Sequence, residues 1–167
     1  MPIDEDYGKL LAAIMKKDFS RMTGIDYIAV GGGGAAGQAD FKKDVKTLFA
    51  SLKDDPKVPL KIDGTRWVWA KRIDSDRDIS YLDEKDQVVK EITRKIRVEV
   101  SFDKGVPSSD TLSFSRFALI AIDFKDSVFN VEKMFFVDYA AHDPITKDES
   151  TKLVRDIVLD FPVKEIK

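Results

Sequence analysis

Residues 90–102 alternate apolar and polar side chains, and this alternation constrains the fold more than any other feature of the sequence. The even positions carry Ile92, Ile96, Val98, Val100 and Phe102, whereas charged and polar residues fill the odd positions. Successive side chains of a β-strand point to opposite faces of the sheet. The pattern therefore predicts a strand with one buried face and one solvated face.

Strand patterns also occur on both sides of this segment. Asp63-Gly64 joins "VPLKI" to "TRWVWAKRI" as a predicted hairpin, and Pro59 predicts that the first run lies at a sheet edge. After "ISYL" and a loop at 102–110 come two long strands, "TLSFSRFALIAIDF" and "VEKMFFVDYAA". In the first of these, one face is expected to carry Leu112, Phe114, Ala118, Ile120, Ile122 and Phe124. Long antiparallel strands twist and curl, so we expect this sheet to wrap around helices.

Three helices are predicted. Residues 4–22 and 39–56 carry apolar residues at helical spacing, and Thr146-x-x-Glu149 resembles a capping box ahead of an apolar run. The sequence thus predicts a single α+β domain over residues 1–167. It contains a helical part at 1–56 with a glycine-rich loop at 31–37, a long curved antiparallel meander at 57–143, and a C-terminal helix and tail at 144–167.

Composition excludes several classes of function. The chain has 28 basic and 30 acidic residues, so no basic surface for nucleic acid is indicated. It contains no cysteine, which excludes disulfides and thiolate sites. No apolar run approaches the roughly 18 residues of a membrane span, and the N-terminus is acidic where a signal peptide is basic. We expect a soluble chain that meets a membrane only through a segment outside this sequence.

The stretch "IDYIAVGGGGAAGQADF" raises the possibility of nucleotide or flavin binding. Gly32, Gly34 and Gly37 satisfy G-x-G-x-x-G, and Asp63 stands where the acidic residue of a dinucleotide site is expected. Such a site needs a parallel βαβ unit, whereas the rest of the chain predicts antiparallel hairpins. The favoured interpretation is a flexible connection between two helical elements, with no cofactor.

Candidate catalytic and metal-binding residues are few. Asp123 lies within an apolar strand and could act as a base, assisted by Tyr139 or by His142, the only histidine. The alternative is that Asp123 faces water at the strand end and that His142 lies in a polar loop. "DSDRD" begins like a calcium loop, but Ile79 and Lys85 occupy the positions that require glycine and glutamate, so no metal is expected and a solvated hairpin tip is favoured.

Trp67 and Trp69 lie two residues apart and share one face of their strand. With Arg66 and Arg72 they could form an interaction surface, because tryptophan and arginine are enriched at binding hot spots. Packing beneath a helix explains the tryptophan pair equally well.

Helices packed on a long curved antiparallel sheet resemble the cystatin-like, nuclear-transport-factor-like superfold. Residues 65–143 are most similar to the periplasmic core domain of the bitopic inner-membrane assembly factor of bacterial type IV secretion systems. The segments that carry this resemblance are "TRWVWAKRI", "RKIRVEVSFDKG", "SRFALIAIDF" and "NVEKMFFVDYAAHDP". The Asn-Pro-Leu-Gly turn of that family is absent, since Asn130-Val131-Glu132 stands in its place.

The resemblance implies a non-enzymatic scaffold that contacts itself and other protein subunits, on the periplasmic side of a membrane. The alternative within the superfold is a small-molecule enzyme of the ketosteroid-isomerase or polyketide-cyclase type. That enzyme would use Asp123, Tyr139 and His142 in a pocket between helices and sheet, and it should show an apolar cavity with convergent polar groups. A scaffold should show a filled core and an apolar patch on its outside.

Overall fold

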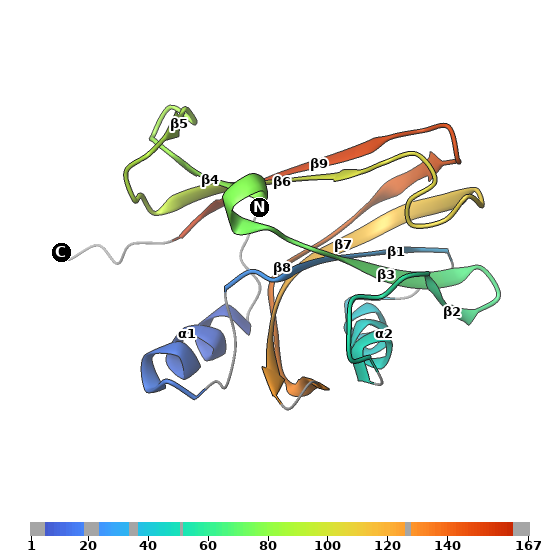
Figure 1. Ribbon diagram of the computed structural model, residues 1–167, viewed down its shortest axis with the longest axis horizontal. Coiled ribbons are helices and arrows are strands. Elements are labelled where there is room, and N and C mark those ends of the chain that lie inside the picture. Colours follow the sequence, from blue (N-terminus) through green and yellow to red (C-terminus); the bar gives the residue numbers. More distant parts are fainter. Residues whose placement is uncertain (1–5, 19–23, 34–36, 51, 126–127, 162–167) are drawn as a thin grey trace.

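The computed structural model describes residues 6–18, 24–33, 37–50, 52–125 and 128–161. Two antiparallel sheets and two longer helices form successive layers (Figure 1). One sheet lies in the middle of the molecule, the second sheet covers one of its faces, and helix α2 covers the other. The predicted α+β class and the antiparallel pairing are confirmed.

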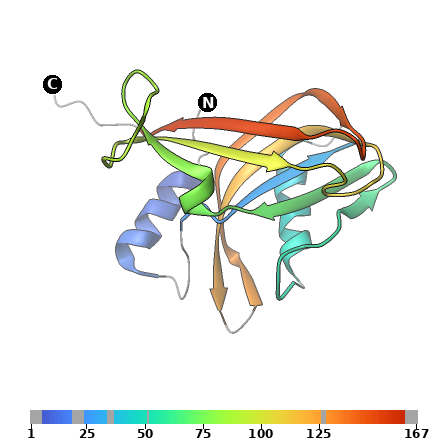
Figure 2. The same cartoon turned by 45° about the horizontal axis from the view of Figure 1, so that its top comes forward.

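The central sheet, called sheet A here, has five strands in the order β2-β3-β1-β7-β8. Their bounds are Leu60–Asp63, Arg66–Arg72, Tyr27–Gly32, Leu112–Lys125 and Val128–Lys147. The predicted hairpin joins β2 to β3, and β2 lies at the sheet edge as Pro59 predicts. Strands β7 and β8 bend strongly, so that their shared hairpin extends down between the helices (Figure 2). Register shifts along this pair account for the bend, because bulges increase local twist.

The second sheet, sheet B, has four strands in the order β5-β4-β6-β9. Their bounds are Val88–Val89, Ile79–Leu82, Lys95–Phe102 and Leu153–Asp160. The predicted alternation is confirmed in β6, where Val98, Val100 and Phe102 are buried and Glu99 is exposed. It is wrong before Lys95, because β6 begins there and Ile92 is 84% exposed. The side chains of Val98, Val100 and Phe102 face sheet A.

The two faces of sheet A border two separate hydrophobic clusters. Between the sheets lie Ile28, Val30, Trp67, Trp69, Phe117, Leu119, Ile157 and Leu159, among others. Between sheet A and α2 lie Tyr27, Ala29, Phe41, Val45, Phe49, Ile120 and Phe136, among others. Strand β1 is buried along its whole length because both of its faces are covered. The middle of sheet A is therefore an internal layer of the molecule.

The predicted single apolar face of β7 is wrong at Leu112 and Phe114, which both pack against the inter-sheet cluster. The register shifts between Phe114 and Arg116, where two steps along β7 oppose four along β8, and Phe114 faces the inter-sheet cluster while Ala118 and Ile120 face α2. The intervening Phe117 and Leu119 also face the other sheet. A covered strand of this kind has no solvated face.

The predicted C-terminal helix is wrong. Thr146 lies within β8, residues 148–152 form a turn, and Leu153–Asp160 forms β9, which pairs with β6. The carboxylate of Asp148 accepts hydrogen bonds from the Ser150 backbone amide, the Ser150 hydroxyl and the Thr151 hydroxyl. Aspartate commonly accepts hydrogen bonds from the following residues of a tight turn, so this segment forms a turn where a helix cap is predicted.

Three helices are present among the described residues: α1 (Asp6–Lys16), α2 (Gln38–Ala50) and α3 (Ser75–Asp78). The predicted apolar stripe of α2 is confirmed from Phe41 to Phe49. The acidic "DSDRD" segment does not form the expected hairpin tip. It forms α3, which carries the chain from sheet A to sheet B, with Asp74 as the N-cap.

Candidate functional site

The three predicted catalytic residues do not converge. Tyr139 pairs with Ala118 across the β7–β8 ladder, whereas Asp123 pairs with Asn130. Ala118 and Asp123 are five residues apart, which corresponds to roughly 16 Å along a strand. The rings of Tyr139 and His142 also lie on opposite faces of sheet A. The Tyr139 ring packs against Phe41 of α2, and the His142 ring packs against Phe117 in the inter-sheet cluster.

Asp123 is buried with 1% of its surface exposed, so the expected solvated strand end is wrong. His142 is also not in a loop, because it lies half-buried within β8. Its Nδ1 is 2.7 Å from the Asp143 carbonyl oxygen, which places a proton on Nδ1 and leaves Nε2 to accept from the Arg155 guanidinium. Arg155 also stacks over the Phe117 ring, and burial lowers its pKa. The imidazole of His142 thus contacts Asp143, Arg155 and the Phe117 ring.

Aromatic side chains fill the layer between α2 and sheet A, where the enzyme alternative requires a cavity. The Tyr27 ring centroid lies 4.9 Å from that of Phe49, and the Phe49 centroid lies 5.1 Å from that of Phe129. Edge-to-face contacts at these distances are typical of a packed core. The space expected to hold a substrate is occupied by the protein's own rings.

The glycine-rich stretch is not a flexible connection where it is described. Gly31 and Gly32 end β1, which lies between β3 and β7 in the interior of sheet A. A Cβ atom on Gly32 would lie 1.6 Å from the Ser113 carbonyl oxygen, and one on Gly33 would lie 1.8 Å from the Thr65 carbonyl oxygen. Gly33 also has a φ of +73°. Close approach of neighbouring backbones requires glycine here.

The geometry of a dinucleotide site is not formed around these glycines. Strand β1 pairs antiparallel with both of its neighbours, and Asp63 ends the edge strand β2, which pairs with β3. A parallel βαβ unit is therefore not made by β1, α2 and β2. Gly37 precedes α2 and its carbonyl accepts from the Phe41 amide, while Gly34 lies outside the described residues.

The tryptophan pair is buried, with Trp67 and Trp69 exposing 3% and 7% of their surfaces. Both pack between the two sheets and not beneath a helix. Arg66 pairs with Asp44 of α2, and Arg72 pairs with Asp55 while covering the Tyr27 ring. These arginines hold the helix and the following loop against sheet A, so the four residues do not form one exposed surface.

The outward side of α1 is an exposed apolar surface that the sequence does not predict. Leu11, Ile14 and Met15, called the α1 face here, expose 44%, 43% and 76% of their surfaces. The helical spacing of Leu10, Leu11, Ile14 and Met15 predicts one buried stripe, but Leu10 is the one buried residue of α1. Leu10 reaches the end of the inter-sheet cluster, and α1 otherwise lies beside β8 (Figure 1).

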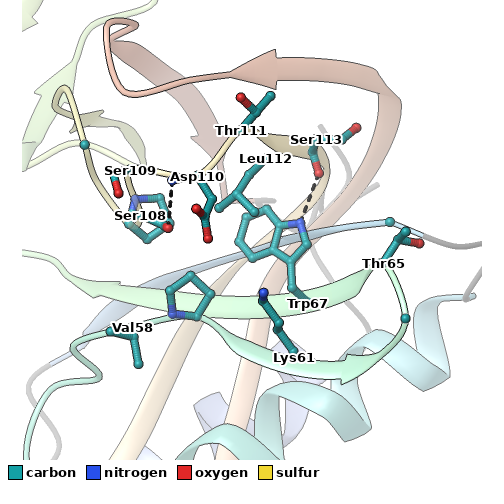
Figure 3. Close-up of a pocket in the computed structure, with 15 residues that line it drawn as sticks. Val58, Lys61, Thr65, Trp67, Ser108, Ser109, Asp110, Thr111, Leu112 and Ser113 are labelled. Atoms are coloured by element: carbon teal, nitrogen blue, oxygen red, sulfur yellow. Dashed lines mark hydrogen bonds between the residues drawn. The ribbon is translucent and has the colours of Figure 1, made fainter.

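A cleft of about 860 Å³ opens at one end of the two-sheet sandwich (Figure 3). Its walls are the β2–β3 hairpin and the loop at 103–111 that crosses from β6 to β7. The residues that decide its chemistry are Lys61, Trp67, Ser108, Asp110 and Leu112. We call it the mouth cleft.

No helix in the described part of the chain is long and apolar enough to cross a membrane. Within the same residues, no three or more histidine, aspartate or glutamate side chains gather as metal ligands. Searches of protein-family models, curated proteins and solved structures find no match to this chain.

Proposed function

We propose that the chain is a non-enzymatic protein-interaction domain that contacts its partners through the α1 face. The observation that carries this proposal is the exposure of Leu11, Ile14 and Met15 on one short helix. Burying these side chains against a partner removes apolar surface from water, worth roughly 25 cal/mol for each Å². Because Leu11 and Ile14 are already more than half buried, each gains less than the about 1.5–3 kcal/mol of a side chain buried from full exposure. Clustered apolar exposure of this kind is typical of association sites.

Two further observations support an interaction domain over the enzyme alternative. Aromatic rings fill the layer between α2 and sheet A, and Asp123, Tyr139 and His142 are separated along and across the sheet. Catalysis needs polar groups positioned around one reacting atom. An interaction domain needs only a stable core and an outward surface.

The narrower proposal is an assembly component of a bacterial type IV secretion or conjugation system. Its support is the resemblance of residues 65–143, which implies partners among other protein subunits and a second copy of the chain. The cystatin-like, nuclear-transport-factor-like superfold and a periplasmic location belong to this narrower proposal.

Light scattering across protein concentration tests the proposal through self-association. We expect the average mass of the wild-type protein to rise with concentration. The mass of Met15→Glu should stay at that of a monomer, because a charge on the α1 face opposes its burial. Val88→Glu is the matched control, since Val88 is 61% exposed but lies on β5 in sheet B. An equal rise in all three proteins would show that the α1 face is not the contact, and a wild-type protein that stays monomeric would rule out self-association.

A further inference from the structure

The mouth cleft is a preformed feature rather than a gap between loose loops. The Trp67 indole Nε1 donates to the Ser113 carbonyl oxygen at 3.3 Å, and the indole packs edge-on against Phe114 with centroids 4.9 Å apart. These contacts fix the floor of the cleft to β7. Because Trp67 is buried, it supplies a rigid edge and not a stacking platform.

The opposite wall, the 103–111 loop, is tied to β8 at its start and carries a hydrogen bond within itself near its end. Buried Lys147 donates from Nζ to the Asp103 carbonyl oxygen at 2.8 Å, which holds the start of the loop to β8. Further along, the Asp110 amide donates to the Ser108 hydroxyl oxygen at 3.0 Å. A wall that is already held in place lowers the ordering cost of binding.

Charge in the cleft is balanced across its two walls. Among the described residues that line it, the charged side chains are Lys61 and Asp110. Figure 3 shows Lys61 rising from β2 and Asp110 descending from the opposite loop toward the space between them. No ion pair between these two side chains occurs within the described residues, so both can serve a ligand.

This balance discriminates between classes of ligand. A phosphate-bearing ligand requires several cationic or amide donors, and here the Asp110 carboxylate opposes the single ammonium group. A cationic ligand meets the reverse difficulty at Lys61. A ligand without net charge, carrying both donors and acceptors along its length, suits both walls.

The remaining lining is rich in hydroxyl groups and small apolar side chains. Five lining residues are serine or threonine: Thr65, Ser108, Ser109, Thr111 and Ser113. Val58, Pro59 and Leu112 provide apolar contact. A carboxylate accepts from two vicinal hydroxyls and an ammonium donates to hydroxyl or ring oxygens, while the C–H faces of a sugar suit the apolar residues. The cleft volume of about 860 Å³ has room for several linked rings.

We propose that the mouth cleft binds a neutral oligosaccharide between Lys61 and Asp110. This site lies on a different part of the molecule from the α1 face and does not depend on the proposed interaction function. Asp110 accepts hydroxyl protons of the sugar and Lys61 donates to its oxygens. Trp67 holds the floor as a positioning residue.

NMR titration of the full chain tests this inference, with chitotetraose, cellotetraose and maltotetraose as the oligosaccharide probes. The chain has two tryptophans, so the Trp67 indole resonance reports on the cleft and that of Trp69, which does not line it, is an internal reference. Trp69→Phe assigns the two resonances. We expect at least one oligosaccharide to shift the Trp67 resonance saturably while Trp69 stays in place.

Two variants tie binding to the proposed groups. Lys61→Met and Asp110→Asn should each weaken that oligosaccharide about tenfold or more, as expected for loss of a charge-assisted hydrogen bond, and Val88→Glu should leave its affinity unchanged. The proposal is overturned if no oligosaccharide moves the Trp67 resonance at tens of millimolar, or if both cleft variants bind as well as wild type. Shifts caused only by inorganic pyrophosphate or by glycylglycine would also overturn it, by assigning the cleft to an anion or a zwitterion.

Discussion

At the scale of single residues, the glycines that suggest phosphate binding are explained by backbone packing. The sequence shows that Gly31–Gly33 are unusual, but not which neighbours demand glycine. That information depends on Ser113 and Thr65, which lie far along the chain and approach β1 only in the folded sheet. A pattern within one segment cannot reveal contacts of this range.

Gly32→Ala therefore tests the packing explanation. The added Cβ would overlap the Ser113 carbonyl oxygen, so we expect a loss of at least about 2 kcal/mol in the free energy of unfolding, measured in urea. Gly8→Ala is the matched control, because its Cβ would meet no atom within 4 Å and alanine favours a helix such as α1, so it should not lower stability. Equal stability of the two variants would contradict the close approach.

Asp148 provides a second prediction at this scale. Hydrogen bonds from Thr151 and Ser150 lower the pKa of Asp148 to about 2. A carboxylate with a lowered pKa in the folded state contributes stability above the ordinary value near pH 4, and this contribution is lost as the pH falls through about 2. Between pH 5 and pH 2, the urea midpoint of wild type should therefore fall more than that of Asp148→Asn.

Glu149→Gln is the control for this pH series, because Glu149 is an exposed acid in the same turn. Its urea midpoint should follow the wild-type profile. Parallel profiles of wild type and Asp148→Asn would show that the turn does not depend on the ionised carboxylate.

At the scale of elements, the sequence predicts the hairpin at Asp63-Gly64, the edge strand after Pro59 and the buried stripe of α2, because each depends on local chemistry. It fails for β9, since Leu153 and Ile157 fit both a helical spacing of four and a strand spacing of two. The choice between the two is made by β6, which pairs with β9 along its full length. Tertiary pairing overrides the local pattern there.

Two truncations distinguish the strand from the predicted helix. Leu159 is fully buried in β9, so Leu159→Ala should cost about 2–5 kcal/mol of unfolding free energy. Val154 is 48% exposed, so Val154→Ala should cost less than about 1 kcal/mol. The predicted helix places Val154 on its apolar face and would give a substantial cost there, so urea unfolding of both variants decides between the two structures.

At the scale of the whole molecule, the sequence predicts one sheet with helices against it, and the structure places a second sheet on the opposite face. The signal was present in "FALIAI" at 117–122, because a continuous apolar run indicates a strand covered on both sides. Which elements cover it depends on how the chain crosses between sheets, through α3, the 103–111 loop and the 148–152 turn. Local patterns do not determine those crossings.

Strands β1 and β7 contribute side chains to both hydrophobic clusters, so we expect the described part of the chain to unfold as one cooperative unit. Val45 belongs to the cluster beneath α2, whereas both tryptophans lie between the sheets. Val45→Ala should cost about 2 kcal/mol and should shift the tryptophan-fluorescence and far-UV circular-dichroism transitions in urea together, because loss of one cluster exposes a sheet that the other requires. Ile157→Val, in the inter-sheet cluster, should likewise move both transitions by equal amounts. If Val45→Ala shifted the circular-dichroism transition alone, the two clusters would unfold separately and the molecule would behave as a stable sandwich with a detachable helix.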